Sequence, residues 1–336
     1  TFAAALMTGV VVRVDDPGSL RKAVAAAKPG DEVIIEDGTW KDVEVKVLGH
    51  GAEGRTIRIH SATPGGLQIT GSSRVRIGGS YLHVSGLRMR NIRDESDWFQ
   101  LRKDSKNPAH HCRISDCVFE EDRDFDPGDA DARWVGIYGH HNEIDHCRVE
   151  GKKSRGTSVV VWLQPDTPSH HHLHHNHFGP RTRLGRNGGE TIRVGDSKTS
   201  LINAACLIEK NLFEKCNGEV ECISNKSCEN TYRFNLFRQV EGTLSLRHGH
   251  RCLVERNVFL GDDLKHTGGV RIIGEDHVVR ENYFGQLGGT DARGAVVLQT
   301  GIANSPLNGY SPVLRAVVED NHFVGCRESV VIGYVD

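Results

Sequence analysis

The sequence predicts an all-β protein: a right-handed, single-stranded parallel β-helix with a short helix capping its N-terminal end. Three observations support this fold class. One short phrase repeats along the chain, strand-like stretches alternate with glycine and polar residues, and helical periodicity is scarce. Glycine contributes 38 of the 336 residues, which is typical of many short strands joined by tight turns. We expect one domain over residues 1–336.

The two ends of the chain differ in the segments that could cover the β-helix. Residues 1–12 are apolar and are expected to be either the remnant of a secretion signal or the first strand. Residues 19–28 (SLRKAVAAAK) predict a short amphipathic helix with a serine N-cap, which would cover the open edge of the first coil. The C-terminus shows no equivalent cap, so either the chain is cut short or another element covers that end.

The repeated phrase is a strand triplet, two polar residues, then Asn or Cys, one further residue and usually Phe. The intervals between copies range from 22 to 39 residues, and the shortest ones match one coil of about three strands. A propeller blade would need about 40 to 50 residues. The aligned positions are Cys117, Cys147, Asn176, Asn211, Asn235, Asn257, Asn282 and Asn321.

Stacked coils bring equivalent positions to about 4.8 Å from one another, so the repeat predicts an amide ladder and an aromatic ladder. Cys112, Cys206 and Cys252 each lie five residues before a ladder position. Together with the odd total of nine cysteines, this register favours buried thiols over a disulfide framework. The longer intervals predict loops on one face, and residues 94–109, which are rich in charge, are expected to be one of them.

Charge restricts the partners. Lys and Arg (42) nearly balance Asp and Glu (44), so the chain lacks the basic bias of a nucleic-acid-binding protein. An anionic ligand would need a local basic patch. No stretch approaches the ~18 apolar residues that span a bilayer, so we expect no membrane insertion.

The register predicts one cluster of polar residues. Glu219 and Glu221 follow a ladder asparagine, and Arg247 falls on the same strand one coil later, so the three should line one outward groove. Lys226 is expected in the turn after the first of these strands, and Asn187 one coil earlier. Amide and carboxylate oxygens suit Ca²⁺. From spacing alone, glutamates that merely solvate a strand are the alternative interpretation.

The run His170-His171-His172-Leu173-His174-His175-Asn176-His177 suggests a metal site, because imidazole is a common transition-metal ligand. Alternation along a strand divides these side chains between core and surface. We therefore favour structural or groove-lining roles over a zinc site.

Two phrases resemble polysaccharide lyase family 6, which holds alginate lyases and chondroitinase B. They are residues 219–227 (EVECISNKS) and 243–250 (TLSLRHGH). Residues 187–191 (NGGET) look like the alginate lyase form of the preceding motif, and 28–31 (KPGD) and 37–40 (DGTW) fit the first coils. The resemblance covers nearly the whole chain, although relatives commonly continue beyond its end.

The resemblance implies that Asn187, Glu219 and Glu221 bind Ca²⁺ and that Lys226 and Arg247 catalyse β-elimination. A uronate C5 proton is weakly acidic until the neighbouring carboxylate is neutralised, which a Lewis acid achieves. A lysine near calcium and arginine has its charged form disfavoured and can then act as base. Arg247 would protonate or stabilise the leaving oxygen. Without the motifs, a solvated lysine and a structural ion pair are the simpler interpretations.

His248, Arg271 and Arg193 are expected to contact substrate carboxylates. The predicted substrate is alginate, with a secreted or periplasmic location that follows from the polymer. One alternative keeps the fold and changes the substrate to chondroitin or dermatan sulfate. Another is a non-catalytic carbohydrate-binding β-helix, because a fold does not dictate activity. A glycoside hydrolase is less favoured, since Glu219 and Glu221 lie too close to Lys226 and the calcium position. Oligomeric state is left open.

Overall fold

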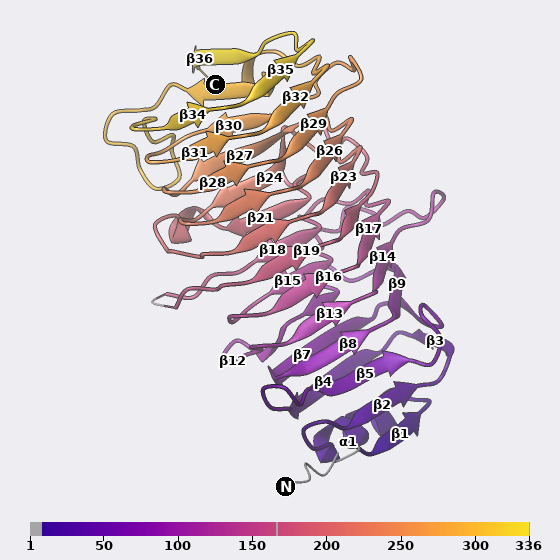
Figure 1. The fold of residues 1–336 in the computed structure, drawn as a ribbon. Coiled ribbons are helices and arrows are strands. Elements are labelled where there is room, and N and C mark those ends of the chain that lie inside the picture. The colour runs from indigo at the N-terminus through magenta and orange to yellow at the C-terminus, as the bar shows by residue number, and fades with distance from the viewer. Residues whose placement is uncertain (1–8, 166, 336) are drawn as a thin grey trace, which may run out of the picture.

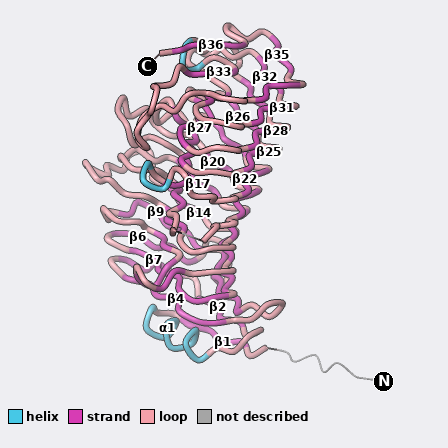
Figure 2. Tube along the Cα trace, turned by 90° about the vertical axis from the view of Figure 1, so that its left-hand side faces the viewer, coloured by secondary structure: helices cyan, strands magenta, loops and turns pink. Residues whose placement is uncertain are grey.

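Figure 1 shows the computed structural model, which describes residues 9–165 and 167–335. The chain winds into stacked coils whose strands form three long parallel sheets, here called sheets A, B and C. The predicted right-handed parallel β-helix is confirmed. Figure 2 shows the coils from the side, with the helix lying across the N-terminal end.

Each coil contributes one strand to each sheet over most of the length. Sheet A contains β1 (Val11–Val14), β2 (Glu32–Ile35), β5 (Ile57–Ser61), β8 (Leu82–Ser85), β13 (Arg113–Ser115), β16 (Glu143–Asp145), β19 (His172–His174), β22 (Leu207–Glu209), β25 (Thr231–Arg233), β28 (Leu253–Glu255), β31 (Val278–Arg280) and β34 (Val317–Glu319). Sheet B contains β3 (Gly38–Lys41), β6 (Leu67–Gly71), β9 (Leu87–Ile92), β14 (Val118–Glu120), β17 (Arg148–Glu150), β20 (His177–Phe178), β23 (Leu212–Glu214), β26 (Leu236–Arg238), β29 (Val258–Leu260), β32 (Tyr283–Gly285) and β35 (His322–Val324). Sheet C contains β4 (Glu44–His50), β7 (Arg74–Ser80), β10 (Phe99–Gln100), β15 (Val135–Ile137), β18 (Val159–Val161), β21 (Ile192–Gly195), β24 (Glu221–Lys226), β27 (Thr243–His248), β30 (Val270–Ile272), β33 (Val296–Gln299) and β36 (Val330–Tyr334). Two single-turn 3₁₀ helices, η1 (Ser197–Thr199) and η2 (Asp291–Arg293), lie in the connections.

The amide ladder is present and continuous from Asn176 to Asn321. At each step the side-chain oxygen of one asparagine accepts from both the backbone N–H and the side-chain amide of the asparagine before it. For Asn235 and Asn257 both contacts measure 3.0 Å. The predicted aromatic ladder runs beside it, with ring centroids 4.5 to 5.1 Å apart from Phe178 to Phe323. All nine cysteines are free thiols, as expected, and eight of them are buried.

The turn between sheets A and B accounts for the Asn or Cys that recurs in the repeat. The residue before each ladder position adopts a left-handed backbone conformation, as in His175 (φ 52°) and Arg256 (φ 53°). This conformation is unfavourable for residues other than glycine and occurs mostly in isolation. The buried amide ladder that follows each turn offsets this cost with hydrogen bonds on every coil.

The capping helix α1 spans Pro17–Ala26, two residues earlier than predicted at each end, and its N-cap is Asp16 rather than a serine. The carboxylate of Asp16 accepts from the backbone N–H groups of Gly18 and Ser19, while Pro17 occupies the first turn, where no N–H is needed. Ser19 completes the capping box instead. Leu20 and Val24 are buried, so the helix covers the first coil as expected.

Two further expectations need correction or limits. Residues 94–109 do contain strands: β10 extends sheet C, and β11 (Arg102–Asp104) pairs with β12 (Asn107–Pro108) as a small antiparallel hairpin. Charge on the outward face concealed them, although Phe99 points into the core. Of residues 1–12, positions 1–8 lie outside the described residues, whereas Val11 and Val12 begin β1. Among described residues, no helix is long and apolar enough to cross a bilayer.

Buried histidines in the ladders predict a pH dependence of stability. His277 Nδ1 accepts the backbone N–H of Cys252, as the amide oxygen of Asn230 does for Cys206. Burial lowers the pKa of His277 from 6.5 to about 4. The unfolded chain therefore takes up a proton at higher pH than the folded chain, and stability present above pH 6.5 falls as the pH drops towards 4.

We expect His277→Asn, which keeps the acceptor, to remove up to about 3 kcal/mol of this acid-dependent loss, since one pKa unit corresponds to about 1.4 kcal/mol. Urea unfolding at pH 7, 5.5 and 4.5 measures it. An unchanged difference between pH 7 and 4.5 in the variant would contradict the assignment.

Candidate active site

The five residues predicted to form the site lie in one cleft on the outer face of sheet C. The cleft has a volume of about 450 Å³. Its lining includes residues of β24 and β27, and these two strands lie in the C-terminal half of the β-helix (Figure 1). Its lining comprises Asn187, Glu190, Glu219, Val220, Glu221, Lys226, Arg247, Arg271, Ala292, Arg293, Tyr310 and Tyr334. The register inferred from the repeat therefore places the five predicted side chains in one cleft.

Irregular strand pairing places two of these side chains. Between β24 and β27 the register shifts twice, so Cys222 is an extra residue in one strand and Arg247 in the other. Such bulges bend a strand locally and re-aim side chains. Glu221 opens β24 and Lys226 closes it, so the lysine belongs to the strand and not to the following turn as predicted. Its backbone pairs with Gly195 and His248 on the two neighbouring strands.

Three carboxylates crowd the N-terminal side of the cleft. Glu190 and Glu221 are buried and Glu219 is half-buried. Burial, followed by repulsion from the other two carboxylates, raises the pKa of Glu219 to about 8. The buried Arg181 lies beneath this group and donates to the carbonyl oxygens of Glu190 and Gly156. Among the described residues, the ion-pair contacts of Glu221 are long, at 3.7 Å to Arg247 and 3.8 Å to Arg271, so a cation between the three carboxylates would lower their mutual repulsion.

Arg247 also lines the cleft, and residues 309 and 310 hold its guanidinium in place. Its guanidinium donates to the carbonyl oxygen of Gly309 at 2.7 Å and stacks over the Tyr310 ring at 3.9 Å from the centroid. Its Nε lies 3.7 Å from Glu221 Oε1. The connection between β33 and β34, which carries Gly309 and Tyr310, therefore orients this guanidinium within the cleft.

The three residues predicted to contact substrate lie in different places. Arg271 lines the cleft, is buried, and donates from Nε to Gln299 Oε1 at 2.6 Å. Arg193 lines the adjoining cavity, where its guanidinium lies 5.1 Å from the Trp162 ring centroid. His248 is buried beside Arg247 and is not among the described lining residues, and its Nε2 lies 3.3 Å from Ser197 Oγ. Burial and the neighbouring cations lower the pKa of His248 to about 3.

Sequence reasoning missed four polar lining residues: Glu190, Arg293, Tyr310 and Tyr334. Glu190 was visible in principle, because it follows Asn187 by three positions within the quoted motif. Arg293 ends η2 between β32 and β33, Tyr310 lies in the long connection between β33 and β34, and Tyr334 ends β36. The repeat gives none of the three a register.

Adjoining cavities extend the cleft in both directions. One, of about 440 Å³, contains Arg183, Arg186 and His266, and the other, of about 330 Å³, contains Arg133 and Arg155. Basic side chains thus flank the acidic centre on each side. Acidic residues line both cavities as well, and Arg183 pairs with Glu241 and Arg155 with Asp131. The excess of basic side chains is the local basic patch expected for an anionic ligand.

The fold and the cleft define the class of protein: a parallel β-helix with an elongated, mostly basic groove and a carboxylate cluster at its centre. The family model described as Chondroitinase B matches residues 14–334. The chain therefore belongs to the chondroitinase B family, polysaccharide lyase family 6.

Solved structures agree with this assignment. The family 6 alginate lyase AlyGC superposes with a TM-score of 0.85 at 39% identity, covering 90% of this chain and 42% of its own. A mannuronic acid-specific family 6 lyase from human gut microbiota gives 0.86 at 32% identity, covering 94% and 74%. Alginate lyase AlyF-OU02, in complex with G6, gives 0.82 at 26% identity, covering 99% and 74%. This chain thus spans less than half the length of AlyGC. No curated protein matches it.

Proposed function

We propose that this protein is an alginate lyase that cleaves its polymer by β-elimination, with Lys226 as base and Arg247 at the leaving oxygen. One observation carries the proposal: an amine and a guanidinium share a single cleft with a cluster of carboxylates and an amide. Relatives with 39%, 32% and 26% identity are described as lyases of alginate or mannuronic acid.

Lys226 and Arg247 have different roles in the reaction. Lys226 Nζ accepts the proton from C5 of the uronate, the C5 electron pair forms the C4=C5 double bond, and the C4–O bond breaks. The leaving oxygen keeps the bond electrons and takes a proton, from Arg247 or from water that it orients. Because an arginine rarely deprotonates, the guanidinium acts mainly by stabilising the charge on that oxygen.

We propose that Asn187, Glu219 and Glu221 hold Ca²⁺. The donor set fits, because an amide oxygen and carboxylates are hard ligands, and because burial and two neighbouring carboxylates disfavour the charged form of Glu219, which a bound cation would restore. When bound, the ion supplies a Lewis acid that neutralises the substrate carboxylate. The flanking arginines would then hold the carboxylates of neighbouring sugars.

The test is incubation with alginate, poly-mannuronate, poly-guluronate and dermatan sulfate while the ultraviolet absorbance of the unsaturated product is followed. We expect activity on at least one alginate polymer and a loss of at least about 10²-fold after chelation, restored by Ca²⁺, because charge stabilisation at the reacting centre contributes about this much.

Each other outcome has a definite meaning. Cleavage of dermatan sulfate alone would replace the substrate, and polymer binding without any unsaturated product would indicate a non-catalytic carbohydrate-binding protein. Activity that survives complete chelation would contradict the calcium site and leave the lyase assignment intact. Since alginate lies outside cells, we propose a secreted or periplasmic location.

A further inference from the structure

Four side chains converge on the outward face of sheet A, away from the cleft on sheet C. They are Glu143 on β16, His172 and His174 on β19, and Glu209 on β22. In the strand register Glu143 stands opposite His172, and His174 stands opposite Glu209. Alternation along β19 divides the histidine run as predicted, with Leu173 in the core and the histidines on either side of it outside.

The contacts within this group run along the diagonals. His174 Nε2 lies 2.7 Å from Glu143 Oε1, and His172 Nε2 lies 3.2 Å from Glu209 Oε1. The two rings are 4.0 Å apart between centroids. Each ring nitrogen thus contacts the diagonal carboxylate and not the one directly opposite, and Glu209 touches the group through His172 alone. One donor atom each from Glu143, His172 and His174 all lie within 4.8 Å of one another.

A neighbouring arginine orients Glu209 and leaves its other oxygen to the group, whereas Glu143 has only a distant arginine contact. Arg233 Nε donates to Glu209 Oε2 at 2.6 Å, so the contact to His172 uses the other oxygen. Arg113 makes its short contacts, 2.7 and 2.6 Å, with Asp145 and stays 3.8 Å from Glu143. Support of ligand carboxylates by such second contacts is a regular feature of metal sites.

We propose that Glu143, His172, His174 and Glu209 form a binding site for a transition-metal ion of the zinc class. Two imidazoles with one or two carboxylates match the ligands and coordination number that Zn²⁺ prefers, and rigid strands hold them. This set is richer in nitrogen than the oxygen set of the catalytic cleft. It therefore selects a borderline metal instead of Ca²⁺.

The location gives the ion a role. It would bridge three successive coils at β16, β19 and β22, and the coil of β19 continues through β20 into the connection that bears Asn187. Binding to the folded chain stabilises it by mass action. The ion would thus clamp the coils that support one end of the catalytic cleft without touching its residues.

The measurement is a titration of metal-free protein with Co²⁺, followed by the visible absorption of tetrahedral cobalt, and a count of the Zn²⁺ retained after dialysis. Other groups can also bind metal, notably the imidazoles of His111, His140 and His141. The test is therefore a difference between variants. His172→Leu removes one ligand and installs the residue that already stands beside it in register, Leu207.

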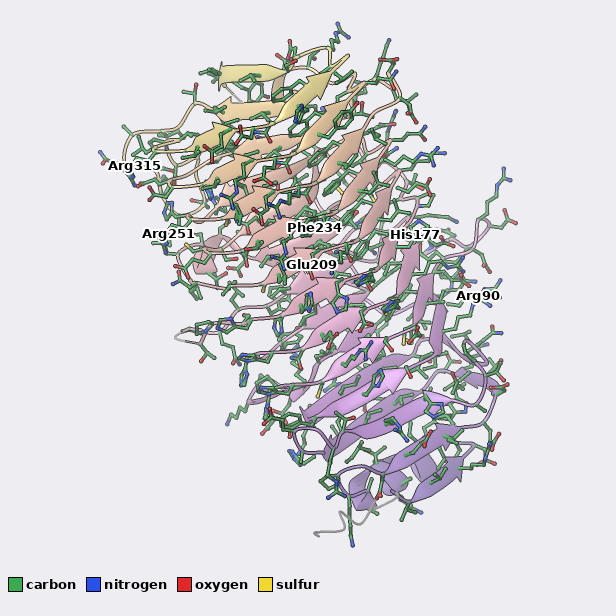
Figure 3. All side chains as sticks on the ribbon, in the orientation of Figure 1. Arg90, His177, Glu209, Phe234, Arg251 and Arg315 are labelled. Atoms are coloured by element: carbon green, nitrogen blue, oxygen red, sulfur yellow. The ribbon has the colours of Figure 1, made fainter. Side chains whose placement is uncertain are left out.

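His177→Leu is the matched control. It lies on the same coil in sheet B, its register partner is Leu212, and Figure 3 labels it apart from Glu209. We expect His172→Leu and Glu143→Gln to bind one equivalent fewer, or to weaken it at least ~100-fold, since loss of a ligand should exceed the 10- to 100-fold cost of losing a second-shell contact. His177→Leu and His140→Asn should keep that equivalent.

The same number of equivalents with the same affinity in His172→Leu as in the wild type would overturn the proposal. So would a loss of the tetrahedral cobalt spectrum in His140→Asn with retention in His172→Leu, because it would assign the site to the other imidazoles. Circular dichroism of each variant verifies that the coils remain folded.

Discussion

Lys226→Ala is expected to lower the rate of alginate cleavage by about 10³-fold while the protein stays folded. General base catalysis contributes about 10² to 10⁴ in rate, and this amine is the only lysine that lines the cleft among the described residues. Lys226 is half-buried at the end of β24, so its truncation leaves the ladders intact. The measurement is the initial rate of absorbance increase at saturating polymer, with thermal unfolding as the check on folding.

Two controls separate the amine's role as base from its charge. Lys226→Arg keeps a cation in place but removes a group that can become neutral, so it should also lose at least about 10²-fold. Lys198→Ala removes an exposed lysine from η1 and should leave the rate unchanged. Retention of more than a tenth of the activity in Lys226→Ala would transfer the base to another group.

The extent to which the site could be predicted depends on the regularity of the coils. Glu219, Glu221, Lys226 and Arg247 fall on coils of 24 and 22 residues between ladder asparagines, where every position has a defined neighbour. Residues on such coils can be placed by counting. The bulges at Cys222 and Arg247 shift the pairing by one residue each, yet Glu221, Lys226 and Arg247 all still line the cleft.

Where the interval between ladder positions is long, counting from an asparagine no longer tells which strand or loop a residue occupies. Tyr310 lies within the interval of 39 residues between Asn282 and Asn321, and nothing in the local sequence places it over Arg247. Lys226 was assigned to a turn because β24 is longer than the usual three residues. The residues of the proposed metal site on sheet A lie close to ladder positions, so counting from those positions is enough to place them. It puts Glu143 beside His172 and His174 beside Glu209.

The ladder that makes this counting possible is also expected to dominate stability. Asn257 is buried and donates to the carbonyl oxygen of Tyr232 and to Asn282 Oδ1, while its own oxygen accepts from Asn235 twice. Asn257→Ala would leave these groups buried without partners, at about 1–3 kcal/mol each. We expect the free energy of unfolding to fall by about 3–5 kcal/mol, measured by urea unfolding.

Position along the ladder supplies the control. Asn321 accepts from Asn282 in the same way, but it lies on the last described coil and is only half-buried. Water can replace its contacts, so Asn321→Ala should cost less than half as much. Asn257→Cys should fall between the two, because Cys147 occupies the same ladder position two coils before Asn211 and there retains a weak sulfur contact to a backbone carbonyl. Equal costs for Asn257→Ala and Asn321→Ala would show that hydrogen bonds along the ladder, buried or not, are replaced equally well by solvent.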